Sequence, residues 1–361
     1  MPYIDVRENY PEKEILLTDI ADVTYLYINS DNDDYLYKGR IHCVTENTIV
    51  IGDDASGSVL FFSKDGMPKS RFNHKGQGPG EYINLRQVIY DEKADEVFVL
   101  SFANANSFLV YSSTGQYKRK IIMPEGTFVQ SFYLFDDVSL FIYDASIERR
   151  IALAYENDSQ TEFYDSRFIR IAKTDGKILN YVELPESKIT LKDELSGMPF
   201  APHRLIKCND GVLLCNPETD TVFLYNKDKS LVPLIYKTPS TSTLDPMIIL
   251  DNCFDAGNYQ FMGVVTVRFG QDGFPYKYLM LDKSTGEIFH QKILLPDYNE
   301  KEFFFSPRRI IDYENGPYIE LDLIELKKAD RENKLSGKLK ELVSTLNEDE
   351  DNNVFMFVNF K

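Results

Sequence analysis

Four arginines stand at equivalent points of the chain, each directly before a short apolar segment. They open the sequences Arg40-Ile41-His42-Cys43, Arg86-Gln87-Val88-Ile89, Arg204-Leu205-Ile206-Lys207 and Arg309-Ile310-Ile311-Asp312. A guanidinium group binds carboxylate, sulfate or phosphate through paired N–H groups. If the four arginines converge, they form a site for an anionic small molecule or glycan, which His203 and Arg308 extend. In the alternative interpretation, each arginine binds a carboxylate or a backbone carbonyl of the neighbouring unit and is structural.

Other side chains that could do chemistry are scattered. The four histidines, His42, His74, His203 and His290, form no His-Glu-x-x-His motif, and no Gly-x-Ser-x-Gly sequence occurs. The densest acidic group, between residues 31 and 54, lacks the spacing and the distal glutamate of an EF-hand. The four cysteines show no Cys-x-x-Cys spacing and are expected to be buried. We therefore predict no catalytic residue, no metal site and no cofactor, with a triad assembled from distant residues as the alternative.

The glycine cluster Gly76-x-Gly78-x-Gly80 has the composition of a phosphate-binding loop. Such a loop needs a helix directly after the glycines, because the N–H groups of its first turn face the phosphate. The residues that follow, 85–90, have the composition of a strand. We therefore interpret the cluster as a crossing between two repeat units that requires the backbone freedom of glycine.

A repeated element must position these side chains. Five short apolar runs end in a polar turn of the same form, with Gly66, Gly115, Gly176, Lys229 and Gly286 at the equivalent turn position. Glycine there supplies the positive φ of a tight hairpin, and lysine is the one departure. Prolines that end the outgoing strand follow in phase, at Pro124, Pro185, Pro239 and Pro296. This period predicts an array of β-hairpins, as in a β-propeller.

Two further apolar segments precede each hairpin, so that a unit has four strands, the number in a propeller blade. The predicted blades span residues 41–72, 84–124, 128–185, 203–239, 254–296 and 308–361. The last unit lacks one strand, which the N-terminal segment 23–28 is predicted to supply, closing the ring. Residues 334–346 carry leucines at helical spacing and predict one amphipathic helix in the last blade. The predicted fold is a single all-β domain over residues 1–361, a six-bladed β-propeller of four-stranded antiparallel blades.

The charge balance excludes one class of partner. The formal net charge of −17 opposes binding to nucleic acid, which needs a basic surface. No apolar run approaches the ~18 residues that span a bilayer, so no transmembrane segment is predicted. The opening residues 1–6 lack the basic and apolar regions of a signal peptide, an absence compatible with a cytoplasmic protein or with a trimmed exported one.

The stretch Asn73-His74-Lys75-Gly76-Gln77-Gly78-Pro79-Gly80-Glu81-Tyr82, followed by Leu85-Arg86-Gln87-Val88, resembles the signature of a family of six-bladed propellers. Members are cell-envelope proteins, often lipoproteins, of anaerobic gut bacteria and are similar to NHL and TolB-type propellers. The resemblance extends to the opening segment 15–23 and to the closing strand before Lys361. It implies a propeller fold and a periplasmic or surface-exposed location, and it implies no reaction.

The leading hypothesis from the sequence is a non-enzymatic propeller that binds an anionic small molecule or glycan at the arginine-lined channel mouth. One alternative is a propeller hydrolase or lyase that acts on glycans or lactones with a divalent metal in the channel. Arginines in the channel disfavour that metal. The other alternative is a platform for protein partners, which would use the rim or the helix near Leu339.

Overall fold

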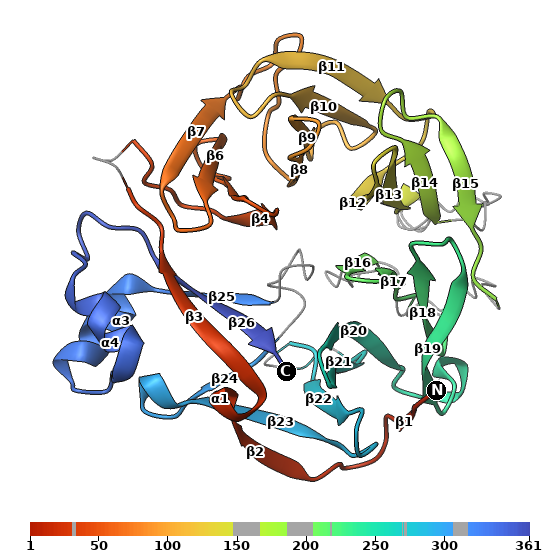
Figure 1. The fold of residues 1–361 in the computed structure, drawn as a ribbon. Coiled ribbons are helices and arrows are strands. Elements are labelled where there is room, and N and C mark those ends of the chain that lie inside the picture. The colour runs from red at the N-terminus through yellow and green to blue at the C-terminus, as the bar shows by residue number, and fades with distance from the viewer. Residues whose placement is uncertain are drawn as a thin grey trace.

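The computed structural model describes residues 1–30, 34–146, 167–185, 205–216, 219–268, 270, 273–305 and 317–361. Figure 1 shows the sheets arranged in a ring around a central channel, with the strands of each sheet stacked outward from the centre. The first strand of each complete sheet lies nearest the channel, and these inner strands contact one another from sheet to sheet around the ring. The fold is therefore an all-β β-propeller, as predicted.

The first three blades are four-stranded and antiparallel throughout. Blade 1 contains β4 (Arg40–Val44), β5 (Thr48–Gly52), β6 (Ser58–Ser63) and β7 (Pro68–Asn73). Blade 2 contains β8 (Gln87–Asp91), β9 (Glu96–Leu100), β10 (Ser107–Tyr111) and β11 (Tyr117–Ile122). Blade 3 contains β12 (Val129–Asp136), β13 (Ser139–Asp144), β14 (Phe168–Ala172) and β15 (Ile178–Val182).

Blades 4 and 5 each gain an extra outer strand from the N-terminal segment. Blade 4 contains β16 (Leu205–Cys208), β17 (Gly211–Leu214), β18 (Thr221–Asn226) and β19 (Leu231–Thr238), and β1 (Tyr3–Asp5) pairs in parallel with β19. Blade 5 contains β20 (Ile248–Ala256), β21 (Tyr259–Thr266), β22 (Tyr276–Asp282) and β23 (Ile288–Leu295). In blade 5, β2 (Glu12–Leu16) pairs in parallel with β23, and β24 (Lys301–Phe303) pairs with β23 antiparallel. The sequence did not predict these additions.

The last sheet corrects the predicted blade count. Its described strands are β25 (Tyr318–Leu321), β26 (Val354–Phe360) and β3 (Ala21–Tyr27), in that order from the inside. Among the described residues the ring thus has five blades of four or more strands and one three-stranded sheet, where six four-stranded blades are predicted. The predicted closure by the N-terminal strand is confirmed, because β3 pairs antiparallel with β26 over seven residues. Residues 309–324 are predicted to form two strands. Within that range β25 is observed at Tyr318–Leu321 and α3 begins at Leu323, whereas residues 309–316 lie outside the described residues.

Two helices, where one is predicted, connect β25 to β26. They are α3 (Leu323–Arg331) and α4 (Gly337–Ser344), and a single turn, α1 (Leu17–Ile20), precedes β3. The first helix begins at Asp322, whose side chain accepts the N–H of Glu325. It ends where Asn333 takes a positive φ of 55°. Leu339 and Val343 of α4 are buried against the ring, as their helical spacing predicts. Short 3-10 turns occur at η1 (Thr241–Thr243) and η2 (Pro296–Tyr298).

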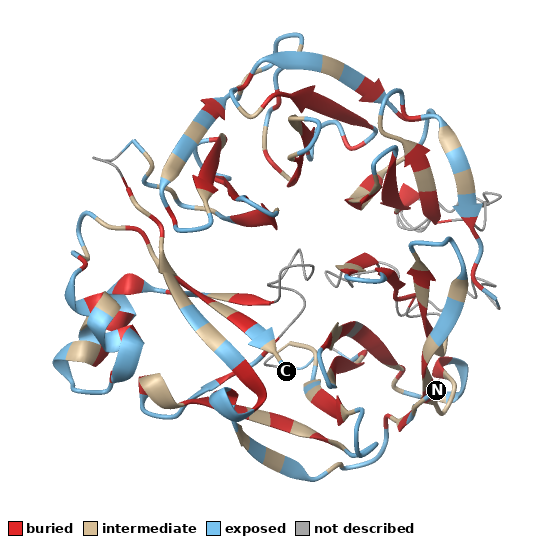
Figure 2. Cartoon of the chain, viewed as in Figure 1, coloured by how far each residue is buried: buried red, intermediate tan, exposed pale blue. Residues whose placement is uncertain are grey.

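Burial follows the position of a strand in its blade. Figure 2 shows buried residues on the inner and middle strands and mixed exposure on the outer strands. Strands β9 and β10 are almost entirely buried, whereas Ile121 is the one buried residue of β11. Valine, phenylalanine and tyrosine suit strands that are covered on both faces. Packing of blade on blade therefore accounts for the high aromatic content of the chain.

The predicted turn position is confirmed. The four glycines have φ between 76° and 84°, and Lys229 has φ 71°, so that a lysine occupies the left-handed region at the fourth turn. A residue with a Cβ is strained there by about 1–2 kcal/mol.

We expect Lys229→Gly to raise the free energy of unfolding by about 0.5–1 kcal/mol, because relief of the strain exceeds the entropy that glycine adds to the unfolded chain. Lys229→Ala keeps the strain and removes the same charge, and should leave stability nearly unchanged. Urea denaturation of both variants checks this. Equal effects of glycine and alanine would show that charge or side-chain contacts, and not the backbone, govern the site.

Candidate functional site

Arg40 and Arg86 lie together at one end of the channel. Arg40 begins β4 and Arg86 directly precedes β8, so that each stands at the entry of an inner strand. The Nη2 atom of Arg40 donates to the carbonyl oxygen of Arg86 at 3.1 Å. The Nε atom of Arg86 donates in turn to the carbonyl oxygen of Gln130 at 2.9 Å. These three residues define the channel mouth, and the bonds between them join blades 1, 2 and 3.

Four other predicted site residues, His203, Arg204, Arg308 and Arg309, lie outside the described residues. For Arg40 and Arg86, the hydrogen bonds match the alternative in which each arginine ties its blade to the next through a backbone carbonyl. An anion site needs N–H groups beyond those used in the ties, and each guanidinium has such groups.

Arg86 lies beside two aromatic rings. Its guanidinium carbon lies 4.9 Å from the centre of the Phe102 ring and 5.4 Å from that of Phe128. Burial lowers its pKa. Among the residues that the structure describes, no carboxylate pairs with it. The Phe102 side chain is 54% exposed at this mouth, so an aromatic surface beside the cation faces solvent. Sequence reasoning missed both phenylalanines, because they lie in loops outside the repeated strands.

The glycine-rich loop between blades 1 and 2 is a crossing, as interpreted from the sequence. The N–H of Gly78 donates to Oε2 of Glu81 at 2.8 Å, so that the loop already binds a carboxylate of its own chain. A Cβ at Gly76 would lie 2.0 Å from the same oxygen. The Tyr82 hydroxyl donates to the carbonyl of Gly57, and the loop runs into strand β8 without a helix. The N–H of Gly78 is therefore occupied by Glu81, and the loop does not have the arrangement of a phosphate-binding loop.

Two of the described histidines, His42 and His74, have structural partners. His42 of β4 is fully buried, and its Nδ1 accepts the N–H of Val88 in the next blade at 3.0 Å. Burial lowers the pKa of His42 to about 3, so that the ring is neutral at physiological pH. His74 stacks on Tyr111 with ring centres 5.0 Å apart and bonds to the carbonyl oxygen of Gly115. Both rings hold blades 1 and 2 together.

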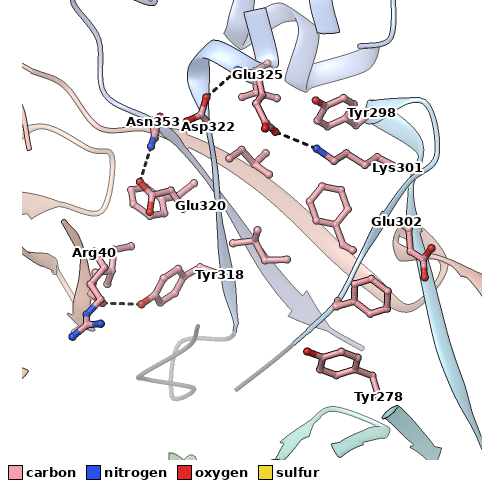
Figure 3. Close-up of a pocket in the computed structure, with 17 residues that line it drawn as sticks. Arg40, Tyr278, Tyr298, Lys301, Glu302, Tyr318, Glu320, Asp322, Glu325 and Asn353 are labelled. Carbon is pink, nitrogen blue, oxygen red and sulfur yellow. Dashed lines mark hydrogen bonds and ion pairs between the residues drawn. The ribbon is translucent and has the colours of Figure 1, made fainter. Parts of the chain in front are cut away.

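A cavity of about 890 Å³ lies between blade 5 and the three-stranded sheet (Figure 3). It is formed mainly by β22, the segment around β24, β25 and the start of α3, and it reaches Arg40. Its polar lining comprises Arg40, Lys301, Glu302, Glu320, Asp322, Glu325 and Asn353. Its aromatic lining comprises Tyr278, Tyr298, Phe303, Phe304, Tyr318 and Phe355. Except for Arg40, no residue of this cavity was predicted from the sequence. The one local signal is the run Glu302-Phe303-Phe304-Phe305, which places aromatic side chains on successive residues beside a carboxylate.

A second cavity, of about 670 Å³, lies at the other end of the inner strands. It is lined by the turns that follow β4, β8 and β12 and by residues of β16 and β17. Two of its carboxylates already have partners within the protein. Asp91 pairs with Lys173 at 2.5 Å, and Glu92 accepts a hydrogen bond from the hydroxyl of Thr48.

The described part of the chain holds no group of three or more histidine, cysteine or acidic side chains placed to bind a metal. None of the helices in the described ranges is long and apolar enough to cross a membrane.

The ring of radially stacked antiparallel sheets, open along a central channel, defines a β-propeller protein. The sequence matches the family described as Domain of unknown function (DUF4934) over residues 1–359, and the chain belongs to that family. No curated protein matches it.

Solved structures to which this chain is similar include three from bacteria. A crystal structure of a "Putative exported protein" from Bacteroides fragilis has a TM-score of 0.66 and 19% identity, covering 97% of this chain and 99% of that one. A member of the duf4221 family from Bacteroides vulgatus has a TM-score of 0.48 and 11% identity, covering 95% and 97%. BamB from Moraxella catarrhalis has a TM-score of 0.39 and 9% identity, covering 94% and 98%. The first of these similarities supports the propeller fold and extends over the whole ring.

Proposed function

We propose that this protein is a non-enzymatic binding propeller of the cell envelope, which takes an anionic small molecule or glycan at the channel mouth. The observation that carries the proposal is Arg86. Its guanidinium is partly buried beside Phe102 and Phe128, and its Nε–H donates to the carbonyl oxygen of Gln130. No acidic side chain among the described residues pairs with it. A cation held in this way is stabilised when an anion arrives, because the anion compensates its lost hydration.

The aromatic rings fit the glycan part of the proposal. A sugar presents an apolar face that packs on an aromatic ring, and a carboxylate or sulfate group on that sugar would reach the guanidinium beside it. Arg40 adds positive charge, because its guanidinium lies near enough to bond the backbone of Arg86. The envelope location is supported by the resemblance of the 73–82 loop to envelope propellers and by the description of the Bacteroides fragilis relative as exported.

The test is isothermal titration of the protein with glucuronate, a sulfated disaccharide and a sugar phosphate, each beside its uncharged parent sugar. We expect Arg86→Gln to weaken binding of the best anion about 10- to 100-fold, the effect of one charge-assisted contact. Glutamine keeps an N–H that can still donate to Gln130. Phe102→Ala should weaken binding about two- to fivefold.

Lys120→Gln is the matched control. Lys120 is exposed on β11, the outer strand of blade 2, and its replacement removes the same charge. It should leave affinity unchanged. If Arg86→Gln binds the anion as well as the wild type does, Arg86 is a tie between blades only and the proposal is wrong. A stoichiometric divalent ion whose removal abolishes hydrolysis of a glycan or lactone would replace the proposal with the hydrolase alternative.

A further inference from the structure

The cavity between blade 5 and the three-stranded sheet has the opposite charge preference to the channel mouth. Four carboxylates line it, against Arg40 and Lys301. In Figure 3 the guanidinium of Arg40 points away from the aromatic side chains, and it is bonded to the backbone of Arg86. Lys301 is paired with Glu325 at 3.5 Å. The described lining of the cavity therefore carries net negative charge that these two cations do not cancel.

Glu320 is the carboxylate best placed to bind a ligand. It belongs to β25, is accessible to solvent, and accepts one hydrogen bond, from Nδ2 of Asn353 at 2.8 Å. No cationic side chain of the described residues pairs with it. Burial by the surrounding protein raises its pKa, and the nearby charge of Asp322 adds to that rise. An accessible carboxylate inside a concave site is destabilised when it is charged, so an arriving cation is bound favourably.

The same cavity already binds an ammonium group of its own chain. The Nζ atom of Lys301 lies 4.5 Å from the centre of the Tyr298 ring and 3.5 Å from Oε2 of Glu325. Figure 3 marks the ion pair between Lys301 and Glu325 with a dashed line. An ammonium between a carboxylate and an aromatic face is stabilised by both. Around Glu320 the carboxylate is present without an ammonium group from any described residue. Across the cavity, the rings of Tyr278 and Phe304 are 5.2 Å apart, and Phe304 is 47% exposed, leaving an aromatic wall uncovered.

We propose that this cavity is a second ligand site, in which Glu320 binds a primary ammonium group while Tyr278 and Phe304 contact the apolar body of the ligand. The volume of about 890 Å³ suits a small organic amine. The three residues proposed to contact the amine differ from Arg86, Phe102 and Phe128 of the anion site, although Arg40 borders both sites.

The test is isothermal titration with phenethylamine and with 2-phenylethanol, which has the same body and no charge. We expect the amine to bind at least 10-fold more tightly than the alcohol. Glu320→Gln keeps an acceptor for Asn353 and should reduce amine affinity at least 10-fold. Glu46→Gln removes the same charge from an exposed residue at the other end of the channel and should leave affinity unchanged.

Phe304→Ala changes no charge and lies on the exposed wall, so that it tests the site even if Glu320→Gln fails to fold. It should weaken binding of the amine about three- to tenfold. Equal affinity for amine and alcohol, an unchanged affinity in a folded Glu320→Gln variant, or no saturable binding of the amine up to about 10 mM, would each overturn the proposal.

Discussion

Gly66→Ala is expected to lower the free energy of unfolding by about 2–5 kcal/mol. Two causes add at this position. The φ of 82° strains any residue with a Cβ by about 1–2 kcal/mol. The new Cβ would also lie 2.1 Å from the carbonyl oxygen of Tyr27, in the N-terminal strand that closes the ring. That oxygen belongs to a paired backbone that cannot move freely, so the contact adds about 1–3 kcal/mol of overpacking.

Gly286→Ala is the matched control for this prediction. Its φ of 76° gives the same backbone strain, but nothing lies within 4 Å of the position that its Cβ would occupy. We expect a loss of about 1–2 kcal/mol there. Urea denaturation of both variants measures the difference, which isolates the packing of one blade on the next. If the two variants lose the same stability, β3 moves to accommodate the added methyl group, and the contact between residue 66 and the carbonyl oxygen of Tyr27 is not a tight one.

The first three turn glycines share this second role. A Cβ at Gly115 would lie 2.5 Å from that of Phe72, and one at Gly176 would lie 2.6 Å from Cγ2 of Ile121. Phe72 and Ile121 belong to β7 and β11, the outer strands of the preceding blades. Each turn therefore packs against the outer strand of the blade before it. The repeat of glycine in the sequence reflects a contact between blades as well as a turn.

Lys173→Met is expected to lower the free energy of unfolding by about 3–5 kcal/mol. Lys173, in the turn after β14 of blade 3, pairs with Asp91 at the end of β8 in blade 2 at 2.5 Å. The two side chains are 13% and 5% exposed, so the substitution leaves a buried carboxylate without its cation. Removal of one partner of a buried ion pair costs about this much, because the remaining charge is neither hydrated nor paired.

Lys93→Met makes the same substitution in an exposed pair. Lys93 lies 3.7 Å from Asp137, with the two side chains 83% and 84% exposed. We expect a change of about 0.5 kcal/mol or less, since water already hydrates both charges. Adding Asp91→Asn to Lys173→Met should recover part of the lost stability, because the unpaired charge is then absent. Similar small losses in both single variants would show that the Asp91 pair is effectively solvated.

The sequence by itself determined the repeated hairpin and the ring closure. Both depend on local chemistry: a positive φ marks the turn at Gly66 and its equivalents, and covered strands need apolar residues on successive positions. The prediction of a closing strand succeeded because β3 and β26 are the two apolar segments near the ends without a hairpin partner. The helical spacing over 334–346 predicted α4 but not α3, whose first residues, Leu323 and Ile324, fall at the end of the segment 309–324 that is predicted to form two strands.

Only the tertiary structure decided what surrounds each candidate residue. The alignment of arginines predicted that Arg40 and Arg86 lie near each other, but the phenylalanines beside Arg86 come from loops that carry no period. The parallel pairing of β1 and β2 on the outer edges is likewise invisible in sequence, since any exposed strand edge can accept a partner. The cavity at Glu320 joins residues of β4, β22, β24 and β25, which are far apart along the chain. Strand periodicity fixes which side chains face in or out, whereas the packing of whole blades fixes which of them meet.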